Sequence, residues 1–227
     1  MKSTMSSPPQ LPALRRQLTD LSCSFLVGHF SRLSPWKGQH VLIEALALCP
    51  PQIGAMFVGD ALFGEEKYVE ELKALAKALG VCDRVCFLGF QSQVLPLMRA
   101  CNLLAHTATA PEPFGRVIVE GMLCGRPVVA AADGGALELI DHGRTGWLTP
   151  PGNASSLAEI LTMSYHTPAL TAIIARQGQL VAQERFNLTE INAQIQHVLL
   201  TAATNSPCLA SAHLASECVA TELSEQG

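Results

Sequence analysis

The sequence is poor in charged and in aromatic residues. Of its 227 residues, 15% are charged and 5% are aromatic, while 48% are hydrophobic. The net charge of -4 excludes a general electrostatic attraction to nucleic acid or to anionic lipid. Any anion that this chain binds must therefore be bound locally, and no nucleic-acid partner is expected.

Signals for a metal site, a disulfide framework or a membrane span are also missing. The eight cysteines are scattered and form no Cys-x-x-Cys pair, so we expect buried free thiols and no metal. No apolar run reaches the length of a membrane span, and the first residues, MKSTMSSPPQLPALRRQLTD, do not resemble a signal peptide. We expect a cytoplasmic protein, with peripheral attachment to the inner face of a membrane left open.

Two nucleotide-binding fingerprints are absent as well. No G-x-G-x-x-G follows the first predicted strand, and no G-x-x-x-x-G-K-[ST] occurs anywhere. The chain is therefore not expected to be a classical dinucleotide dehydrogenase or a P-loop NTPase.

Short apolar segments alternate with helical patterns from Cys23 onward. Because parallel strands need long crossovers and are buried on both faces, this alternation predicts a doubly wound α/β fold with a parallel, Rossmann-like sheet of six strands. The predicted strands are 24–30, 53–59, 83–90, 102–107, 127–131 and 146–150. The predicted helices between and after them are 41–49, 66–80, 93–101, 116–125, 136–143 and 155–165.

The domain organisation follows from where this alternation starts and stops. Residues 1–22 are polar and Pro-rich and are predicted to be a lead-in or the remnant of an interdomain linker. One domain is predicted over 23–186, a C-terminal helix over 187–204, and a mobile tail over 205–227.

The loop after the first strand, GHFSRLSPWKG, places cations where a ligand could meet them. Ser34 has the pattern of an N-cap and Pro35 that of a first helical residue, so Lys37 is predicted in the first turn. A cation there costs a few tenths of a kcal/mol unless an anion lies nearby. Arg32 lies in the same loop, and Gly28 is expected to let a ligand approach the backbone. The alternative is a solvated surface loop.

The loop after the fourth strand, TATAPEPFGRVIVEGMLCG, adds two carboxylates. Glu112 precedes a helix that Gly115 and Arg116 open, and Glu120 lies inside it. A helix rises about 7 Å between Gly115 and Glu120. The two carboxylates could therefore bind hydroxyl pairs at opposite ends of an elongated ligand whose anionic middle lies over the helix N-terminus. The alternative makes Glu112 a cap and Glu120 a surface residue.

A third loop and three histidines leave their roles open. Gly134 and Gly135 fit either backbone amides close to a ligand or an ordinary turn. His29, His106 and His142 lie near the same turns, and each is expected to be a loop or core residue rather than a ligand or a base.

These motifs resemble a known family. The stretches SRLSPWKGQHVLIEAL, RVCFLGF, EPFGRVIVEGMLCGRPVVAA and GGALELIDHGRTGWLTPPGN occur in the order and spacing found in the C-terminal, donor-binding domain of family 4 retaining glycosyltransferases, which have the GT-B fold. The resemblance covers residues 25–186. EPFGRVIVE is similar to the family's E-x7-E motif, and Arg32 with Lys37 to its R-x4-K pair.

The resemblance implies a UDP-sugar or GDP-sugar donor. Arg32 and Lys37 would hold the diphosphate, Glu112 would contact the sugar hydroxyls, and Glu120 would contact the ribose. The backbone amides that would complete this cradle are those of Phe114, Gly115, Arg116 and Val117. No nucleophile is required, because retention in this family is usually discussed as same-face attack assisted by the leaving phosphate.

The chain departs from the family in two respects. Members carry an N-terminal Rossmann-like domain that binds the acceptor, whereas here residues 1–22 alone precede the donor domain. The acceptor, a sugar or a lipid, would then require a separate domain or self-association. A non-catalytic nucleotide-sugar-binding module, a truncated remnant and a sugar-nucleotide epimerase are the alternatives. Many members also have alanine where this helix has Gly121, at a cost of about 1 kcal/mol.

Overall fold

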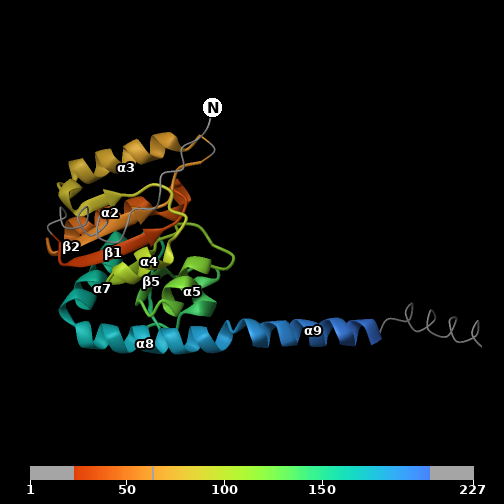
Figure 1. The fold of residues 1–227 in the computed structure, drawn as a ribbon. Helices are drawn as coiled ribbons and strands as arrows, with labels where there is room; N and C mark the ends of the chain where they lie inside the picture. Colours follow the sequence, from red (N-terminus) through yellow and green to blue (C-terminus); the bar gives the residue numbers. More distant parts are fainter. Residues whose placement is uncertain (1–22, 63, 205–227) are drawn as a thin grey trace, which may run out of the picture. The chain divides into compact units, whose positions relative to one another are not determined.

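The structure, a computed structural model, describes residues 23–62 and 64–204. Its core is a β-sheet flanked by helices (Figure 1). The sheet has six strands in the order β3-β2-β1-β4-β5-β6, and every pair is parallel, which confirms the predicted fold class. The strands are β1 Phe25–Phe30, β2 Ile53–Val58, β3 Val85–Phe87, β4 Leu103–His106, β5 Val128–Ala131 and β6 Trp147–Thr149. The predicted lead-in and tail lie outside the described residues.

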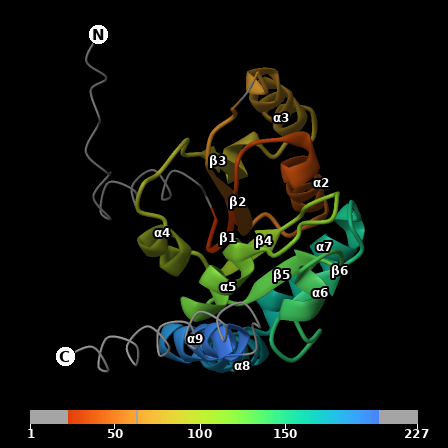
Figure 2. The same ribbon diagram turned by 90° about the vertical axis from the view of Figure 1, so that its right-hand side faces the viewer.

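Helices cover both faces of the sheet, as a doubly wound fold requires. One face is covered by α2 (Gln39–Leu48), α3 (Glu66–Ala78) and α7 (Ala154–His166), and the other by α4 (Leu95–Ala100) and α5 (Arg116–Leu123) (Figure 2). Shorter elements are the 3-10 helices η1 (Pro35–Lys37) and η2 (Cys82–Arg84) and the one-turn helix α6 (Ala136–Leu139). Strands β1, β2, β4 and β5 are buried along their whole length, because both of their faces are covered.

The chain divides into two compact units within its C-terminal helices. The first of two compact units ends at Ala182 and the second begins at Gln183, so α8 (Pro168–Arg185) runs from one into the other. The second unit also holds α9 (Leu188–Thr204). Within residues 23–62 and 64–204, no helix has both the length and the apolar character needed to cross a membrane.

The order of the strands determines where a ligand can bind. The chain adds β2 and β3 on one side of β1 and then returns to place β4, β5 and β6 on the other side. Strands β1 and β4 are therefore neighbours, and the loops that follow them leave the same edge of the sheet in opposite directions. Such a switch point at the carboxyl ends of the strands is the usual ligand site of an open α/β sheet.

Two glycines are explained by packing. Gly28 lies inside β1, paired with Met56 and Leu104, within the predicted strand 24–30 and not in the ligand-facing loop to which the stretch GHFSRLSPWKG also assigned it. A Cβ on Gly28 would lie 2.5 Å from Sγ of Cys101, so the position has no room for a side chain. Gly121 of α5 is similar, because its Cβ would lie 2.6 Å from Cδ1 of Leu104. This glycine lets α5 approach β4 closely.

A substitution tests the corrected role of Gly28. We expect Gly28→Ala to lower the free energy of unfolding by about 1–3 kcal/mol, because the added methyl overpacks the contact with Cys101. Adding Cys101→Ala should recover part of this loss, since it removes the sulfur. Denaturant titration of the two variants measures both effects, and additive losses in the double variant would contradict the packing account.

Candidate functional site

Two adjoining cavities open at the switch point. One, of about 360 Å³, holds Lys37 and Glu112, and the other, of about 470 Å³, holds Glu120. Both are lined by the same central group: Phe30, Ser31, Arg32, Arg116 and Val117. The four charged residues of the R-x4-K and E-x7-E patterns therefore line one continuous site, with the two carboxylates in different compartments.

The segment around Lys37 differs from its predicted form. Pro35–Lys37 is a separate 3-10 turn, which Gly38 ends in the left-handed conformation (φ 69°), and α2 begins only at Gln39. Ser34 does not cap it with its side chain, because its Oγ donates a hydrogen bond to Oε1 of Glu65 at 2.7 Å. A 3-10 turn of three residues satisfies the same Ser-Pro pattern as an α-helix N-terminus, so the sequence did not distinguish the two.

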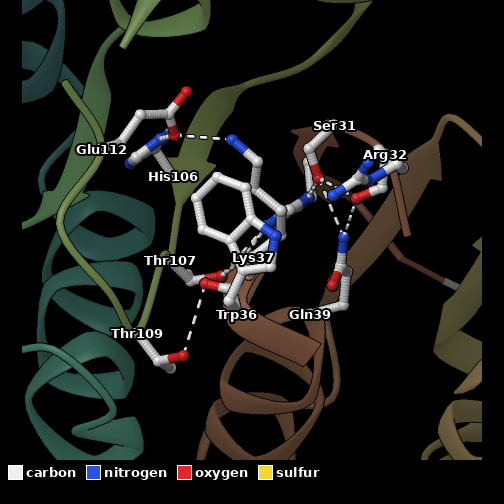
Figure 3. A network of polar contacts seen from close by, with 10 residues as sticks. Ser31, Arg32, Trp36, Lys37, Gln39, His106, Thr107, Thr109 and Glu112 are labelled. Carbon is white, nitrogen blue, oxygen red and sulfur yellow. Dashed lines mark hydrogen bonds and ion pairs between the residues drawn. The ribbon is translucent and has the colours of Figure 1, made fainter. Parts of the chain in front are cut away.

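A carboxylate accompanies Lys37 in this structure. Nζ of Lys37 donates to Oε2 of Glu112 at 2.7 Å and lies 4.1 Å from the centroid of the Trp36 ring (Figure 3). Nε2 of His106 donates to the same oxygen at 2.6 Å. Oε2 of Glu112, in the loop after β4, thus contacts both the loop after β1, through Lys37, and the end of β4, through His106.

Arg32 also lies next to a carboxylate. Its Nε is 3.6 Å from Oε2 of Glu65, which precedes α3. Both side chains are about one-third exposed, at 33% and 29%, so this ion pair contributes little to stability. Arg32 lines both cavities.

Buried hydrogen bonds fix the loop between Arg32 and Gly38. Nε2 of Gln39 donates to Oγ of Ser31 at 2.8 Å and to the carbonyl of Arg32 at 2.9 Å. Oγ1 of Thr107 donates to the carbonyl of Gly38 at 2.7 Å, and Nε2 of His29 lies 3.0 Å from that hydroxyl (Figure 3). The loop that carries the two cations is therefore held by side chains from α2, β1 and the segment after β4.

Glycines allow the site's loops to touch. A Cβ on Gly38 would clash with the carbonyl oxygen of Thr107, and one on Gly134 with that of Glu112. Gly135 donates its N–H to the carbonyl of Glu112 at 2.8 Å. The glycine pair of the third loop thus supports the loop that carries Glu112.

The remaining predicted site residues begin α5. Gly115 is its N-cap, with φ 84°, and Arg116 is its first residue. Arg116 and Val117 line both cavities, and Phe114 is 47% exposed at the same edge. A helix N-terminus with this exposure offers backbone N–H groups and a partial positive charge to an anion.

Sequence reasoning missed three residues of the site. His106 was assigned no role, and Glu65 and Trp36 were not considered, yet each contacts a predicted residue. The signal that could have found His106 is its place at the carboxyl end of a strand beside β1. In the part of the chain that the structure describes, no group of three or more His, Cys, Asp or Glu side chains is arranged to hold a metal, and the expected absence of a metal stays a prediction.

Electrostatics favour an ionised Glu112 and a neutral His29. The hydrogen bond from His106 and that from Lys37 lower the pKa of Glu112 to about 2, against the opposing effect of burial. Burial lowers the pKa of His29 to about 3, because the imidazolium would lose its hydration. Glu112 is thus an anion at neutral pH, whereas His29 is a neutral structural residue.

Comparison with known proteins shows the family and the fold. The family described as "Glycosyl transferases group 1" matches residues 13–180. Crystal structures of HepE from Anabaena superpose closely; the complex with UDP-glucose has a TM-score of 0.80 and 55% identity, covering 86% of this chain and 54% of HepE. The lipopolysaccharide core biosynthesis glycosyltransferase LpsE of Rhizobium meliloti is 32% identical over 153 residues, which cover 67% of this chain and 43% of LpsE.

The chain spans about half the length of these relatives or less. The D-inositol 3-phosphate glycosyltransferase of Mycolicibacterium vanbaalenii, 34% identical over 164 residues, is matched over 36% of its length. The match therefore concerns one domain of each relative, and its sheet agrees with the Rossmann-like domain of GT-B glycosyltransferases.

The depressed pKa of His29 predicts a measurable pH dependence. Between about pH 6.5 and 3 the unfolded chain binds a proton that the folded chain does not, so the free energy of unfolding decreases as the pH is lowered, by roughly 1 kcal/mol per pH unit. His29→Gln should remove this slope, and the exposed His166→Gln should keep it. Denaturant titrations between about pH 5 and 6.5, above the range of most carboxylates, test this. Equal slopes for wild type and His29→Gln would contradict it.

Proposed function

The chain belongs to the group 1 glycosyltransferases, and we propose that its switch-point site binds a nucleoside diphosphate sugar as the donor half of a sugar transfer. The observation that carries this proposal is the pair of cavities that meet at Arg32 and the N-terminus of α5, with one carboxylate in each. The HepE complexes with UDP and with UDP-glucose favour a UDP-sugar over a GDP-sugar.

The diphosphate would lie where the two cavities join. Arg32 and Lys37 supply positive charge there, and the first N–H groups of α5, at Arg116 and Val117, have no acceptor within the helix. Charge on the departing nucleotide would be stabilised by groups already in place, an effect that is often the largest in an active site.

The two carboxylates would bind the two ends of the donor. Glu120 lies on α5 in the larger cavity, with Phe90 and Gln91, and is assigned to the ribose hydroxyls. Glu112 lies in the other cavity and is assigned to the sugar hydroxyls. An ionised carboxylate accepts hydrogen bonds only, so it suits a ligand that presents neighbouring hydroxyl donors.

The proposed reaction retains the configuration of the sugar. The bond between the anomeric carbon and the diphosphate oxygen breaks, and the acceptor hydroxyl oxygen bonds to that carbon on the same face. The acceptor proton passes to an oxygen of the leaving diphosphate. This chain's residues would bind and stabilise the leaving group.

The acceptor site would come from a separate domain or from a second copy of the chain. Leu62, Phe90 and Phe114 are large apolar side chains exposed at or beside the site, at 49%, 74% and 47%. Such side chains at one edge suit coverage by another domain. We also propose a cytoplasmic location, supported by the free thiols of the described cysteines.

Binding of UDP tests the donor site. We expect millimolar UDP to raise the melting temperature of the chain, and Lys37→Ala or Arg32→Ala to weaken UDP binding by about tenfold or more, because each removes a charged contact to phosphate. Lys73→Ala, which removes an exposed cation on α3, is the matched control and should bind as wild type does. No thermal shift with UDP or GDP would count against the donor site.

Transfer by the chain alone tests the need for a second half. We expect purified monomer to bind UDP-glucose and to release little UDP or sugar, because closure of two domains excludes water and places the acceptor. Measuring UDP release with and without acceptor sugars checks this. Rapid transfer by the monomer would contradict the proposed division, and binding without transfer under every acceptor condition would favour a binding module.

A further inference from the structure

His106 lies beside the proposed sugar subsite with a buried side chain and a short bond to Glu112. It is the last residue of β4, a strand with neighbours on both sides, and its side chain is 9% exposed. Its ring is therefore carried by a strand that is paired on both sides. Nε2 lies 2.6 Å from Oε2 of Glu112, which is short for an N–H···O bond, and bonds to a charged acceptor are the shorter ones.

The orientation of the ring follows from its two nitrogens. Because a carboxylate at neutral pH only accepts hydrogen bonds, Nε2 must carry the hydrogen. Nδ1 is buried and has no hydrogen-bond partner among the described residues. The bond to Glu112 is thus the one hydrogen bond of this ring among the described residues, and it directs an N–H toward the carboxylate.

Without His106, only Lys37 would donate a hydrogen bond to the carboxylate of Glu112 among the bonds described above. Both bonds reach Oε2, while Oε1 is directed away from Lys37 and His106 (Figure 3). The loop backbone is held separately, by the N–H of Gly135 on the carbonyl of Glu112 and by that of Thr109 on the carbonyl of Trp36. A diphosphate that draws the ammonium of Lys37 toward itself would leave His106 as the remaining tether of the carboxylate.

We infer that His106 is a positioning residue for the donor sugar: its Nε2–H holds the carboxylate of Glu112 in place when Lys37 turns to the diphosphate. This inference rests on the proposed donor site and adds a residue to it. The predicted consequence is selective. Loss of His106 should weaken the contribution of the sugar to binding and leave the contribution of the nucleoside diphosphate unchanged.

The experiment compares UDP with UDP-glucose by calorimetry on the full chain. For His106→Leu we expect the UDP dissociation constant to stay within about twofold of wild type, and that of UDP-glucose to rise by about tenfold. His106→Gln, which retains an N–H donor of similar reach, should restore most of the difference. His106→Asn, whose amide is too short to reach Glu112, should behave as His106→Leu does. The ratio of the two constants is insensitive to the folded fraction of each sample.

Two controls separate positioning from general damage. Thr109→Val removes the 3.3 Å bond from its hydroxyl to the carbonyl of Trp36 in the same loop, and it should leave the UDP-glucose to UDP ratio unchanged. In a Glu112→Ala background, His106→Leu should have no further effect on that ratio, because its action passes through the carboxylate.

The outcomes are distinguishable. A wild-type ratio in both His106→Leu and His106→Asn would overturn the role of His106 while leaving the donor site intact. Equal weakening of UDP and UDP-glucose would also overturn it, since it would indicate a structural effect. A wild-type chain that binds neither ligand would overturn the proposed function itself.

Discussion

The carboxylate of Glu112 is the charge on which the site's arrangement depends. It accepts hydrogen bonds from Lys37, after β1, and from His106, at the end of β4, through one oxygen. These strands are adjacent only because the chain reverses its direction of growth across the sheet at this point. The ion pair is 14% and 21% exposed at its two ends, so solvent screens it less than a surface pair. It therefore fixes the two loops against each other at the switch point.

Close approach of backbones makes that contact possible. The carbonyl of Thr107 lies against Gly38, and the carbonyl of Glu112 against Gly134, at separations that no Cβ would permit. The hydroxyl of Thr107 then bonds to the carbonyl of Gly38, and the N–H of Gly135 to that of Glu112. Small residues and backbone hydrogen bonds thus bring the two loops close enough for the charged side chains to link them.

Sequence patterns predicted the sheet, its helices and four charged residues of the site, because apolar alternation and fixed spacing are local properties. They failed where one pattern serves two structures. A glycine occurs both where a ligand approaches the backbone and where a strand packs too closely for a side chain. Gly28 lies in such a closely packed strand. Ser-Pro opens an α-helix or a 3-10 turn, and Gly38 decided between them by ending the turn. His106 was missed because Glu112 reaches it through a loop that folds back. No helical or strand periodicity in the sequence indicates that contact.

Internal pairing of the cations bears on which ligands the proposed site would accept. Arg32 lies beside Glu65 and Lys37 beside Glu112, so an anion must compete with a carboxylate for each cation. A phosphate ion that binds one of these cations would leave the partly buried carboxylate without its ion-pair partner, which costs free energy. A donor that brings hydroxyls as well as a diphosphate offers Glu112 new hydrogen-bond donors while it takes Lys37. Pairing each cation with a carboxylate therefore favours ligands that carry both chemical groups over simple anions, and the tether from His106 keeps the released carboxylate where those hydroxyls would arrive.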